Sequence, residues 1–366
     1  MFLVLLTLVA PPSLSAQVQL QTVAEASQYT RTSRHSDVQT FLRQLAIASP
    51  KLQQLTIGSS VEKRPITAMI LADPPVHTAS DLDDDPRMVA LLLGNIHAGE
   101  CAGKEAILAF LRDLSTQDAR GLLKHFVILA VPNFNVDGNE QQGPQHRPGQ
   151  IGPSEGMGLR ENSQGLDLNR DFIKLESPEV RSLTRFIHQW NPHLFIDTHT
   201  TNGSKHRYHL TYAIAHNPAS PAPVRKWLRE DLLPRVTRQL ATQDINTFFY
   251  GTFNKDQTCW TTFGHEPRYS TEYFGLRGGL SILAEAYSYA PYQKRVEAHY
   301  KFISAVLGQL SSRTKLARQL VHKAGNFEGE LSIRAKNTAY PDKITVAAYR
   351  LVKKPQPKPP GPASES

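Results

Sequence analysis

The stretch LLLGNIHAGECAGKEAILAFL, residues 91–111, joins a run of apolar residues to an amphipathic segment. An apolar run without polar alternation is typical of a strand covered on both faces, and the pattern that follows it is typical of a helix. His97 and Glu100 lie three positions apart in the turn between the two. A strand followed directly by a helix is the unit from which sheets sandwiched by helices are built.

The same alternation of apolar runs and amphipathic segments recurs along the chain, which has 366 residues, 40% of them hydrophobic. Such a chain is long enough to bury a large core. Strands are predicted at residues 65–72, 87–95, 125–133, 193–199 and 279–288, and helices at residues 36–49, 104–114, 178–190 and 222–241. The sequence therefore predicts an α/β fold in which a mixed, mostly parallel central sheet is sandwiched by helices, with a small β-rich appendage near the C-terminus.

The two ends of the chain differ in composition from the rest. Residues 1–16 combine an apolar run with a Pro-Pro break and a final small residue, which is the pattern of a secretory signal; an amphiphilic buried N-terminus is the alternative. We expect a secreted or periplasmic protein with one large domain at 17–324 and no transmembrane segment. A β-rich accessory segment is expected at 325–352 and a disordered Pro/Lys tail at 353–366.

Charge and cysteine content exclude some classes of protein. The net charge is +8, which favours an anionic cell-envelope surface as a neighbour, with a plain solvated basic surface as the alternative. Nucleic acid is not expected as a partner, because the Lys and Arg residues are scattered and no recognition motif accompanies them. Two cysteines are too few for a disulfide framework.

His97 and Glu100 carry the kinds of atom that bind zinc, an imidazole nitrogen and a carboxylate oxygen. A catalytic zinc takes three protein ligands, so a third residue is needed. His199, in FIDTHTTNG, also follows an apolar run. Because the carboxyl ends of parallel strands meet at one edge of a sheet, we expect the three residues to form one metal site. An ordinary polar turn between strand and helix is the alternative for the first two.

Other polar residues extend this constellation. Glu285 lies at the end of the apolar run LSILAEAYSY, where a buried carboxylate needs a partner or a chemical role. The alternative is that Glu285 only forms a salt bridge where the chain leaves the strand. The segment GLDLNRDF places Asp167, Asn169 and Arg170 together, which supplies a carboxylate to orient a ligating histidine and two donors for a substrate carboxylate. A capped loop is the alternative for this segment.

The ordered set HAGE, DLNRDF, DTHTTNG and ILAEAYSY resembles the zinc metallocarboxypeptidases of the carboxypeptidase A type, across roughly residues 35–310. The resemblance implies one Zn²⁺ per chain and peptide or protein C-termini as substrates. The zinc ligands that it implies are His97, Glu100 and His199. It further implies that Glu285 is the general base and acid, that Asn169 and Arg170 bind the substrate carboxylate, and that Asp167 supports His97.

Two further roles in this family are assigned by the same resemblance. The family polarises the scissile carbonyl with an arginine, matched here by Arg147, with Arg160 as its rival. It also closes a tyrosine over the substrate, matched by Tyr273, with Tyr269 as its rival. Digestive members carry an arginine just before the ligand glutamate, whereas this chain has Gly99 there, so the chain is similar to a bacterial-style branch.

The expected activity is hydrolysis of the last peptide bond by metal-activated water with a glutamate base. One alternative is an aspartoacylase-like zinc amidohydrolase acting on N-acyl amino acids, since those relatives also carry an Asn-Arg pair. The other is a catalytically silent protein that binds peptides. Residues 137–165 are predicted to be a binding or lid loop, and the aromatic residues 246–275 to be a pocket wall.

Overall fold

The computed structural model describes residues 20–118, 120–201, 204–325, 338 and 342–349. The strands in this part of the chain are β1 (Leu52–Ser59), β2 (Pro65–Leu71), β3 (Met88–Gly94), β4 (Phe126–Val131), β5 (Leu194–Thr200), β6 (Leu210–Ile214), β7 (Thr247–Phe249), β8 (Thr252–Phe253), β9 (Trp260–Thr261) and β10 (Leu280–Ala286). One mixed sheet has the order β1-β2-β4-β3-β5-β10-β6-β7, and β8 pairs with β9 separately. The four central strands β4, β3, β5 and β10 run parallel to one another.

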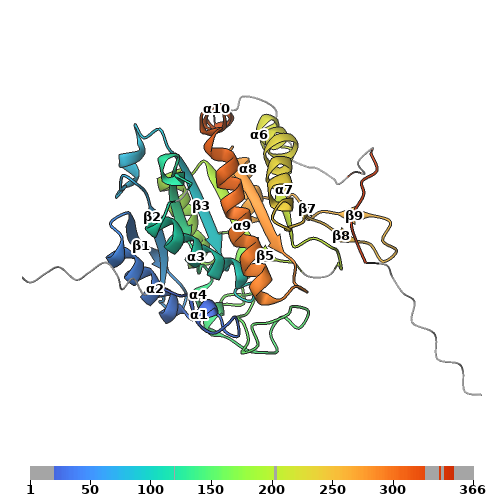
Figure 1. The fold of residues 1–366 in the computed structure, drawn as a ribbon, viewed down its shortest axis with the longest axis horizontal. Helices are drawn as coiled ribbons and strands as arrows, with labels where there is room; N and C mark the ends of the chain where they lie inside the picture. Colours follow the sequence, from blue (N-terminus) through green and yellow to red (C-terminus); the bar gives the residue numbers. More distant parts are fainter. Residues whose placement is uncertain (1–19, 119, 202–203, 326–337, 339–341, 350–366) are drawn as a thin grey trace, which may run out of the picture.

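Helices alternate with these strands (Figure 1). The α-helices are α1 (Val23–Ala26), α2 (His35–Ala48), α3 (Ala102–Thr116), α4 (Val136–Glu140), α5 (Pro178–Trp190), α6 (Ala222–Trp227), α7 (Leu233–Ala241), α8 (Ser270–Leu276), α9 (Tyr292–Ser311) and α10 (Thr314–Gly325). Short helical turns are η2 (Ala79–Leu82), η3 (Leu122–Lys124), η4 (Leu168–Arg170) and η5 (Leu228–Leu232). The predicted α/β sandwich is therefore confirmed.

Two hydrophobic cores lie on the two faces of the sheet. Helices α2, α3, α7 and α9 contribute to one core, and α5 and α8 contribute to the other (Figure 1). Side chains alternate between the cores along a strand: in β3, Leu92 joins the first core, whereas Leu91 and Leu93 join the second. This explains the unbroken apolar runs of the sequence, because both faces of each central strand are buried.

Local sequence signals define individual helices. Helix α5 begins after Ser177, whose side chain accepts a hydrogen bond from the backbone of Val180, and Pro178 occupies its first turn. It ends at Asn191, which adopts the left-handed conformation that closes many helices. The predicted helix at 222–241 is present as α6, η5 and α7, which follow one another without a break.

Helix α3 packs very closely against the sheet. A Cβ atom at Gly103 would lie 1.9 Å from the Oγ1 atom of Thr198 in β5, so only glycine fits at this position. The close approach holds the start of α3, and with it the preceding Glu100, against the strand that carries His199. We infer that Gly103 sets the distance between these two site residues.

The predicted leader at 1–16 and tail at 353–366 lie outside the described residues, as does most of the predicted β-rich segment at 325–352. Within that segment, Ala348 forms an isolated β-bridge with His206.

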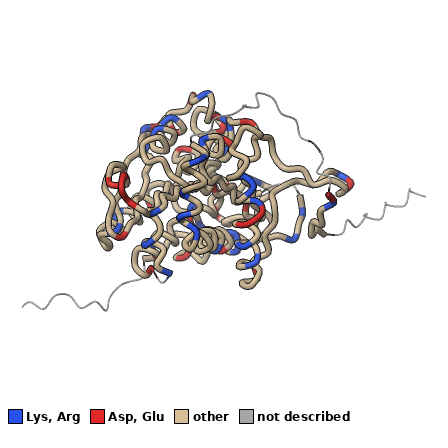
Figure 2. The backbone as a smooth tube through the Cα atoms, turned by 90° about the horizontal axis from the view of Figure 1, so that it is seen from above, with Lys and Arg blue, Asp and Glu red and all other residues tan. Residues whose placement is uncertain are grey.

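Among the described residues, no helix combines the length and apolar character needed to cross a membrane. Lys and Arg residues are interspersed with Asp and Glu over the molecule (Figure 2).

Candidate functional site

Three neighbouring strands bring the predicted site residues together. His97 lies just after β3, His199 near the end of β5, and Glu285 near the end of β10. Glu285 is the direct partner of His199 in the parallel ladder between β10 and β5. Because these strands are parallel and adjacent, their carboxyl ends place the three side chains at one edge of the sheet.

His97, Glu100 and His199 form a compact, buried cluster. One ligand atom from each residue lies within 4.8 Å of the others. The Nδ1 atom of His97 is 3.2 Å from one carboxylate oxygen of Glu100, and the Nδ1 atom of His199 is 2.9 Å from the other. The backbone N–H of Thr200 also donates to Glu100 at 3.0 Å. The Nδ1 atoms of both histidines therefore face a shared carboxylate.

The other ring nitrogen of each histidine contacts a carboxylate. The Nε2 atom of His97 is 3.0 Å from Asp167, and the Nε2 atom of His199 is 3.0 Å from Asp197. A carboxylate on one nitrogen keeps the proton there and leaves the opposite nitrogen free to bind a metal. Two imidazoles oriented in this way, with one carboxylate, are a donor set that suits zinc.

Asp197 is a site residue that the sequence interpretation missed. It lies two positions before His199 in β5, and alternate residues of a strand face the same side. Its carboxylate also accepts a hydrogen bond from the hydroxyl of Ser270, the first residue of α8. The signal that could have found it is therefore a carboxylate at i−2 from a predicted ligand in a buried strand.

The charges of the cluster stabilise one another. Burial alone would raise the pKa of Glu100, but the positive charge of Arg147 and the contacts with two histidines outweigh burial and hold this pKa well below its usual value. Burial likewise opposes the charged form of His199, yet Asp197 and Glu100 raise its pKa well above the usual value. In the absence of a metal, the cluster is therefore a set of compensating ion pairs.

Glu285 has a different environment from Glu100. It is 9% exposed, and burial raises its pKa to about 8, with the positive charge of His199 opposing this shift and the negative charge of Glu100 adding to it. A carboxyl group whose pKa lies near neutrality can both accept and release a proton at physiological pH. Two buried glutamates with pKa values shifted in opposite directions are typical of a site where one is a ligand and the other moves protons.

Asn169 and Arg170 lie on the rim of the same pocket, in η4. The Oδ1 atom of Asn169 accepts a hydrogen bond of 2.8 Å from the backbone of Ser270, which fixes the orientation of its amide. The guanidinium group of Arg170 lies 4.4 Å from the ring centroid of Tyr269 and donates to the carbonyl oxygen of Asn169 at 2.8 Å. These contacts hold two donor groups beside the histidine cluster.

Both arginines considered for the scissile carbonyl line the pocket. The Nη2 atom of Arg147 donates to Glu100 at 2.5 Å. The Nη1 atom of Arg160 lies 3.3 Å from the Nδ1 atom of His97, while its Nε and Nη2 atoms bind Asp167 at 2.9 and 2.8 Å. Arg160 is therefore held mainly by the carboxylate that also contacts His97 and lies 3.8 Å from Glu100, whereas Arg147 forms the closer pair with Glu100.

The structure does not bring Tyr273 into the pocket. Its hydroxyl lies 3.3 Å from the Nε2 atom of His188, and its ring lies 5.5 Å from that of Phe172, because it is placed on the side of α8 that faces α5. Tyr269 and Tyr250 line the pocket instead. Of the two tyrosines named from the sequence, the rival Tyr269 is the one that lines the pocket.

The site residues surround a pocket of about 400 Å³. It is lined by His97, Glu100, Arg147, Arg160, Asn169, Arg170, His199, Thr200, Thr201, Tyr250, Phe263, Tyr269, Thr271, Leu283 and Glu285. The aromatic segment 246–275 supplies one wall of it, as the sequence predicted. Residues 137–165 supply its two loop arginines.

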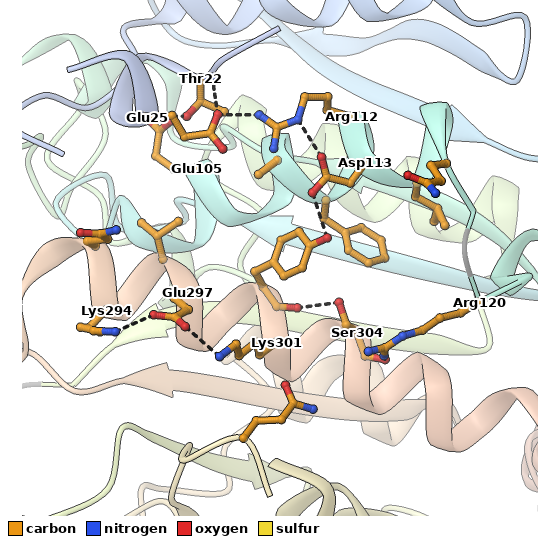
Figure 3. A pocket seen from close by; sticks show the side chains of 18 of the residues that line it. Thr22, Glu25, Glu105, Arg112, Asp113, Arg120, Lys294, Glu297, Lys301 and Ser304 are labelled. Atoms are coloured by element: carbon orange, nitrogen blue, oxygen red, sulfur yellow. Dashed lines mark hydrogen bonds and ion pairs between the residues drawn. The ribbon is translucent and has the colours of Figure 1, made fainter. Parts of the chain in front are cut away.

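A second and larger cavity, of about 710 Å³, lies between α1, α3 and α9 (Figure 3). The charged side chains along it pair with one another: Arg112 with Glu25, and Glu297 with Lys301. None of the residues predicted to form the site lines this cavity. The predicted site residues therefore gather at the smaller pocket at the strand ends.

A mixed α/β sheet with a His-Glu-His cluster at its strand ends is typical of metallohydrolases. The chain belongs to the zinc carboxypeptidase family, which matches residues 38–261, more than half of its length. The resemblance inferred from the sequence is confirmed by this match.

Curated relatives share part of the chain. Mouse (Mus musculus) carboxypeptidase D is 32% identical over 171 residues, which are 39% of this chain and 12% of that protein. Carboxypeptidase 2 of Trichophyton tonsurans is 30% identical over 110 residues, which are 30% of this chain and 18% of that protein. The chain thus matches less than a fifth of the length of these two relatives.

Solved structures share the fold. A metallo-carboxypeptidase from Burkholderia cenocepacia aligns with a TM-score of 0.56 at 19% identity, covering 76% of this chain and 69% of that one. A metallo-carboxypeptidase from Pseudomonas aeruginosa, in complex with (2-guanidinoethylmercapto)succinic acid, aligns with a TM-score of 0.54 at 19% identity, covering 77% and 68%. Both likenesses support the carboxypeptidase-like fold.

Proposed function

We propose that this protein is a zinc metallocarboxypeptidase that removes the last residue from peptides or proteins. The observation that carries the proposal is the convergence, in one pocket, of a His-Glu-His cluster, a glutamate of raised pKa and an Asn-Arg pair. A metal site alone would suit many hydrolases. A metal site beside two donors for a carboxylate suits an enzyme that acts next to a free C-terminus.

One Zn²⁺ per chain would be held by the Nδ1 atoms of His97 and His199 and by the carboxylate of Glu100. Bound there, zinc supplies a Lewis acid that makes water a stronger acid and polarises a carbonyl oxygen. Asp167 and Asp197 hold the two imidazoles in the required tautomer. The three ligand residues are buried, so the site is shielded from bulk solvent on the protein side.

Glu285 would accept the proton of the attacking water and deliver it to the leaving amine. Its place supports this role, because it is the ladder partner of His199 on the neighbouring strand and lines the pocket. Its raised pKa supports the second step, in which the carboxyl group must release a proton at neutral pH.

Arg170 and Asn169 would bind the terminal carboxylate of the substrate. The guanidinium of Arg170 is held above the ring of Tyr269, and the amide of Asn169 is fixed through Ser270, so both donors are ordered before substrate binds. Ordered donors reduce the entropy lost when the substrate binds. We propose that Tyr269, which lines the pocket, contacts the bound substrate in place of Tyr273.

A panel of peptides tests this assignment. We expect peptides with a free C-terminus to be trimmed, and matched C-terminal amides to react about 100-fold more slowly, because the charge-assisted pair with Arg170 is lost. In the variant Arg170→Met the difference between acid and amide should shrink toward unity. Mass spectrometry of products at matched concentrations measures both quantities.

The same panel separates the alternatives. Cleavage of N-acyl amino acids without cleavage of peptides would replace the proposal with an aspartoacylase-like activity. Peptide binding without any turnover, in protein that carries zinc, would indicate a silent binding protein.

Export and contact with an anionic cell-envelope surface remain our proposals for where the protein acts, based on the N-terminal residues and the net charge of +8.

For the scissile carbonyl we propose Arg147. Its Nη2 atom lies 2.5 Å from Glu100, which a bound metal would engage, whereas Arg160 lies 3.8 Å from Glu100 and is held mainly by Asp167 at 2.8 Å. We therefore expect Arg147→Ala to lower kcat by about 100-fold with a smaller change in KM, the pattern of a group that acts mainly in the transition state. Steady-state kinetics with Arg147→Ala and Arg160→Ala side by side check this, and a loss of kcat confined to Arg160→Ala would reverse the assignment.

A further inference from the structure

Arg295, in the first turn of α9, is a fully buried arginine with an unusual set of contacts. Its side chain is 0% exposed. Its Nη2 atom donates to two backbone carbonyls, those of Ile151 and Gly152, the latter at 2.9 Å. Within the described residues, no carboxylate lies within ion-pair distance of the guanidinium, and its Nε and Nη1 atoms have no hydrogen-bond partner.

Such an arrangement is expensive for the folded protein. A buried charge without a paired charge loses its hydration; here the guanidinium receives only two backbone carbonyls and the ring of Tyr292, whose centroid is 5.6 Å from its Cζ atom, and the unpartnered N–H groups add to the loss. Burial accordingly lowers the pKa of Arg295. A side chain that weakens the fold at its own position is a candidate for a role in function.

The carbonyls that Arg295 binds belong to the loop that carries Arg147. This loop is fixed at several points close to the site. The side-chain amide of Gln150 donates to the carbonyl oxygen of Gly99 at 2.8 Å, and its backbone N–H donates to that of Arg147 at 2.9 Å. The N–H of Ile151 donates to the carbonyl oxygen of Ser288 at 3.0 Å, three residues after Glu285.

Gly99 makes room for the side chain that this loop presents. A Cβ atom at Gly99 would lie 2.6 Å from the Cγ atom of Arg147 and 2.8 Å from the carbonyl oxygen of Gly158. The stem of Arg147 therefore lies directly on the backbone before Glu100, where its guanidinium reaches the carboxylate. Arg147 also has a positive φ of 55°, a conformation that needs support from its surroundings.

We propose that Arg295 is a positioning residue for catalysis: by binding the carbonyls of Ile151 and Gly152 it holds the loop that aims Arg147 at the metal site. This inference rests on the proposed carboxypeptidase function and extends it to a residue outside the pocket. Arg295 is not among the residues that line the pocket, so its effect on the reaction is transmitted through the loop. Gly99 supports the same arrangement, because the absence of a side chain there leaves space for Arg147.

The test is the variant Arg295→Met, which fills a similar volume without the charge. We expect kcat/KM to fall by about 10- to 100-fold through misplacement of Arg147, mainly in kcat, while the midpoint of thermal unfolding stays the same or rises. Arg295→Lys, which keeps a donor for the two carbonyls, should recover part of the lost kcat. Zinc content measured on both variants should equal that of the wild type.

A double-mutant cycle isolates the route of the effect. If Arg295 acts through Arg147, then Arg295→Met should cost little further activity in a protein that already carries Arg147→Ala. Full additivity of the two losses would overturn the proposal. So would a drop in thermal stability of Arg295→Met together with wild-type kcat, because that result describes a purely structural residue.

Arg112 provides a matched control. It is a mostly buried arginine, 7% exposed, about three helical turns along α3 from Glu100, and it pairs with Glu25 and Asp113 at 2.5 and 2.7 Å (Figure 3). Arg112→Met should therefore lower thermal stability and leave kcat/KM within about twofold of the wild type, the opposite of what is expected for Arg295→Met.

A readout without turnover keeps this inference separate from the proposed function. Amide hydrogen exchange of the peptide spanning 147–152 should accelerate in Arg295→Met and remain at the wild-type rate in Arg112→Met. If the wild-type protein cleaves no peptide but exchange at 147–152 is still faster in Arg295→Met, Arg295 is retained as the anchor of the loop and the carboxypeptidase function is rejected. Unchanged exchange in Arg295→Met would reject the anchoring itself, whatever the activity.

Discussion

Replacing Glu285 with glutamine will lower kcat/KM by about 10⁴-fold or more and leave zinc bound. Glutamine preserves the size of the side chain but can neither accept a proton from water nor return one to the leaving amine. Because no other carboxylate in the pocket has both a raised pKa and a place beside His199, we expect no substitute to restore the reaction.

Steady-state kinetics and metal analysis of the same preparation measure the two halves of this prediction. Glu179→Gln is a suitable control, since Glu179 is also a fully buried glutamate whose pKa is raised by burial, but it bonds to Val61 and Asn162 on the far side of the sheet from α3. Turnover close to that of the wild type in Glu285→Gln would remove Glu285 from the mechanism.

Replacing His199 with alanine will abolish stoichiometric zinc binding, and activity will fall by at least about 10⁴-fold. In the proposed site this residue supplies one of three ligand atoms, and the other two cannot complete a catalytic zinc site. A chelator should have the same effect on the wild type, with activity restored on adding zinc back. Metal analysis and activity at each stage provide the measurement.

The metal-free protein should nevertheless remain folded. Without zinc, the negative charge of Glu100 is compensated by Arg147 and by His199, whose pKa is raised, so this carboxylate is not left buried without a partner. Circular dichroism before and after chelation tests this, with a lower unfolding temperature expected because zinc binds only the native state. For the His199→Ala variant, the matched control is His125→Ala, because His125 precedes β4 at the opposite end of the sheet. Unfolding on chelation would show that the metal is structural.

The clustering of the candidate ligands could be predicted from the sequence because two independent patterns coincide there. Unbroken apolar runs identify buried parallel strands, and polar residues directly after such runs must meet at one edge of the sheet. His97 and His199 satisfy both conditions, and Glu285 satisfies them on a third strand. No knowledge of side-chain geometry was needed to expect these residues to converge.

The conformation of the loops and the side of α8 that faces the pocket could not be predicted in the same way. Position in the sequence favours Tyr273 over Tyr269, but packing of α8 against α5 and β5 turns Tyr273 toward His188 and away from the pocket. Arg147 and Arg160 both reach the pocket because long-range contacts hold the intervening loop, and Arg295 lies almost 150 residues from its partner carbonyls. Such contacts leave no local periodicity in the sequence.

The order of strands in the sheet has a consequence for the timing of activity. Strand β10, which carries Glu285, is inserted between β5 and β6, both of which precede it in the chain. A chain synthesised only as far as β6 contains the two histidines but lacks Glu285, for which we propose the proton-transfer role, and the strand that carries it. Peptidase competence thus emerges only when a late segment joins the middle of an existing sheet, a non-local step that is slow for sheets of this kind. The enzyme that we propose would therefore be inert toward neighbouring chains until β10 has been synthesised and inserted between β5 and β6.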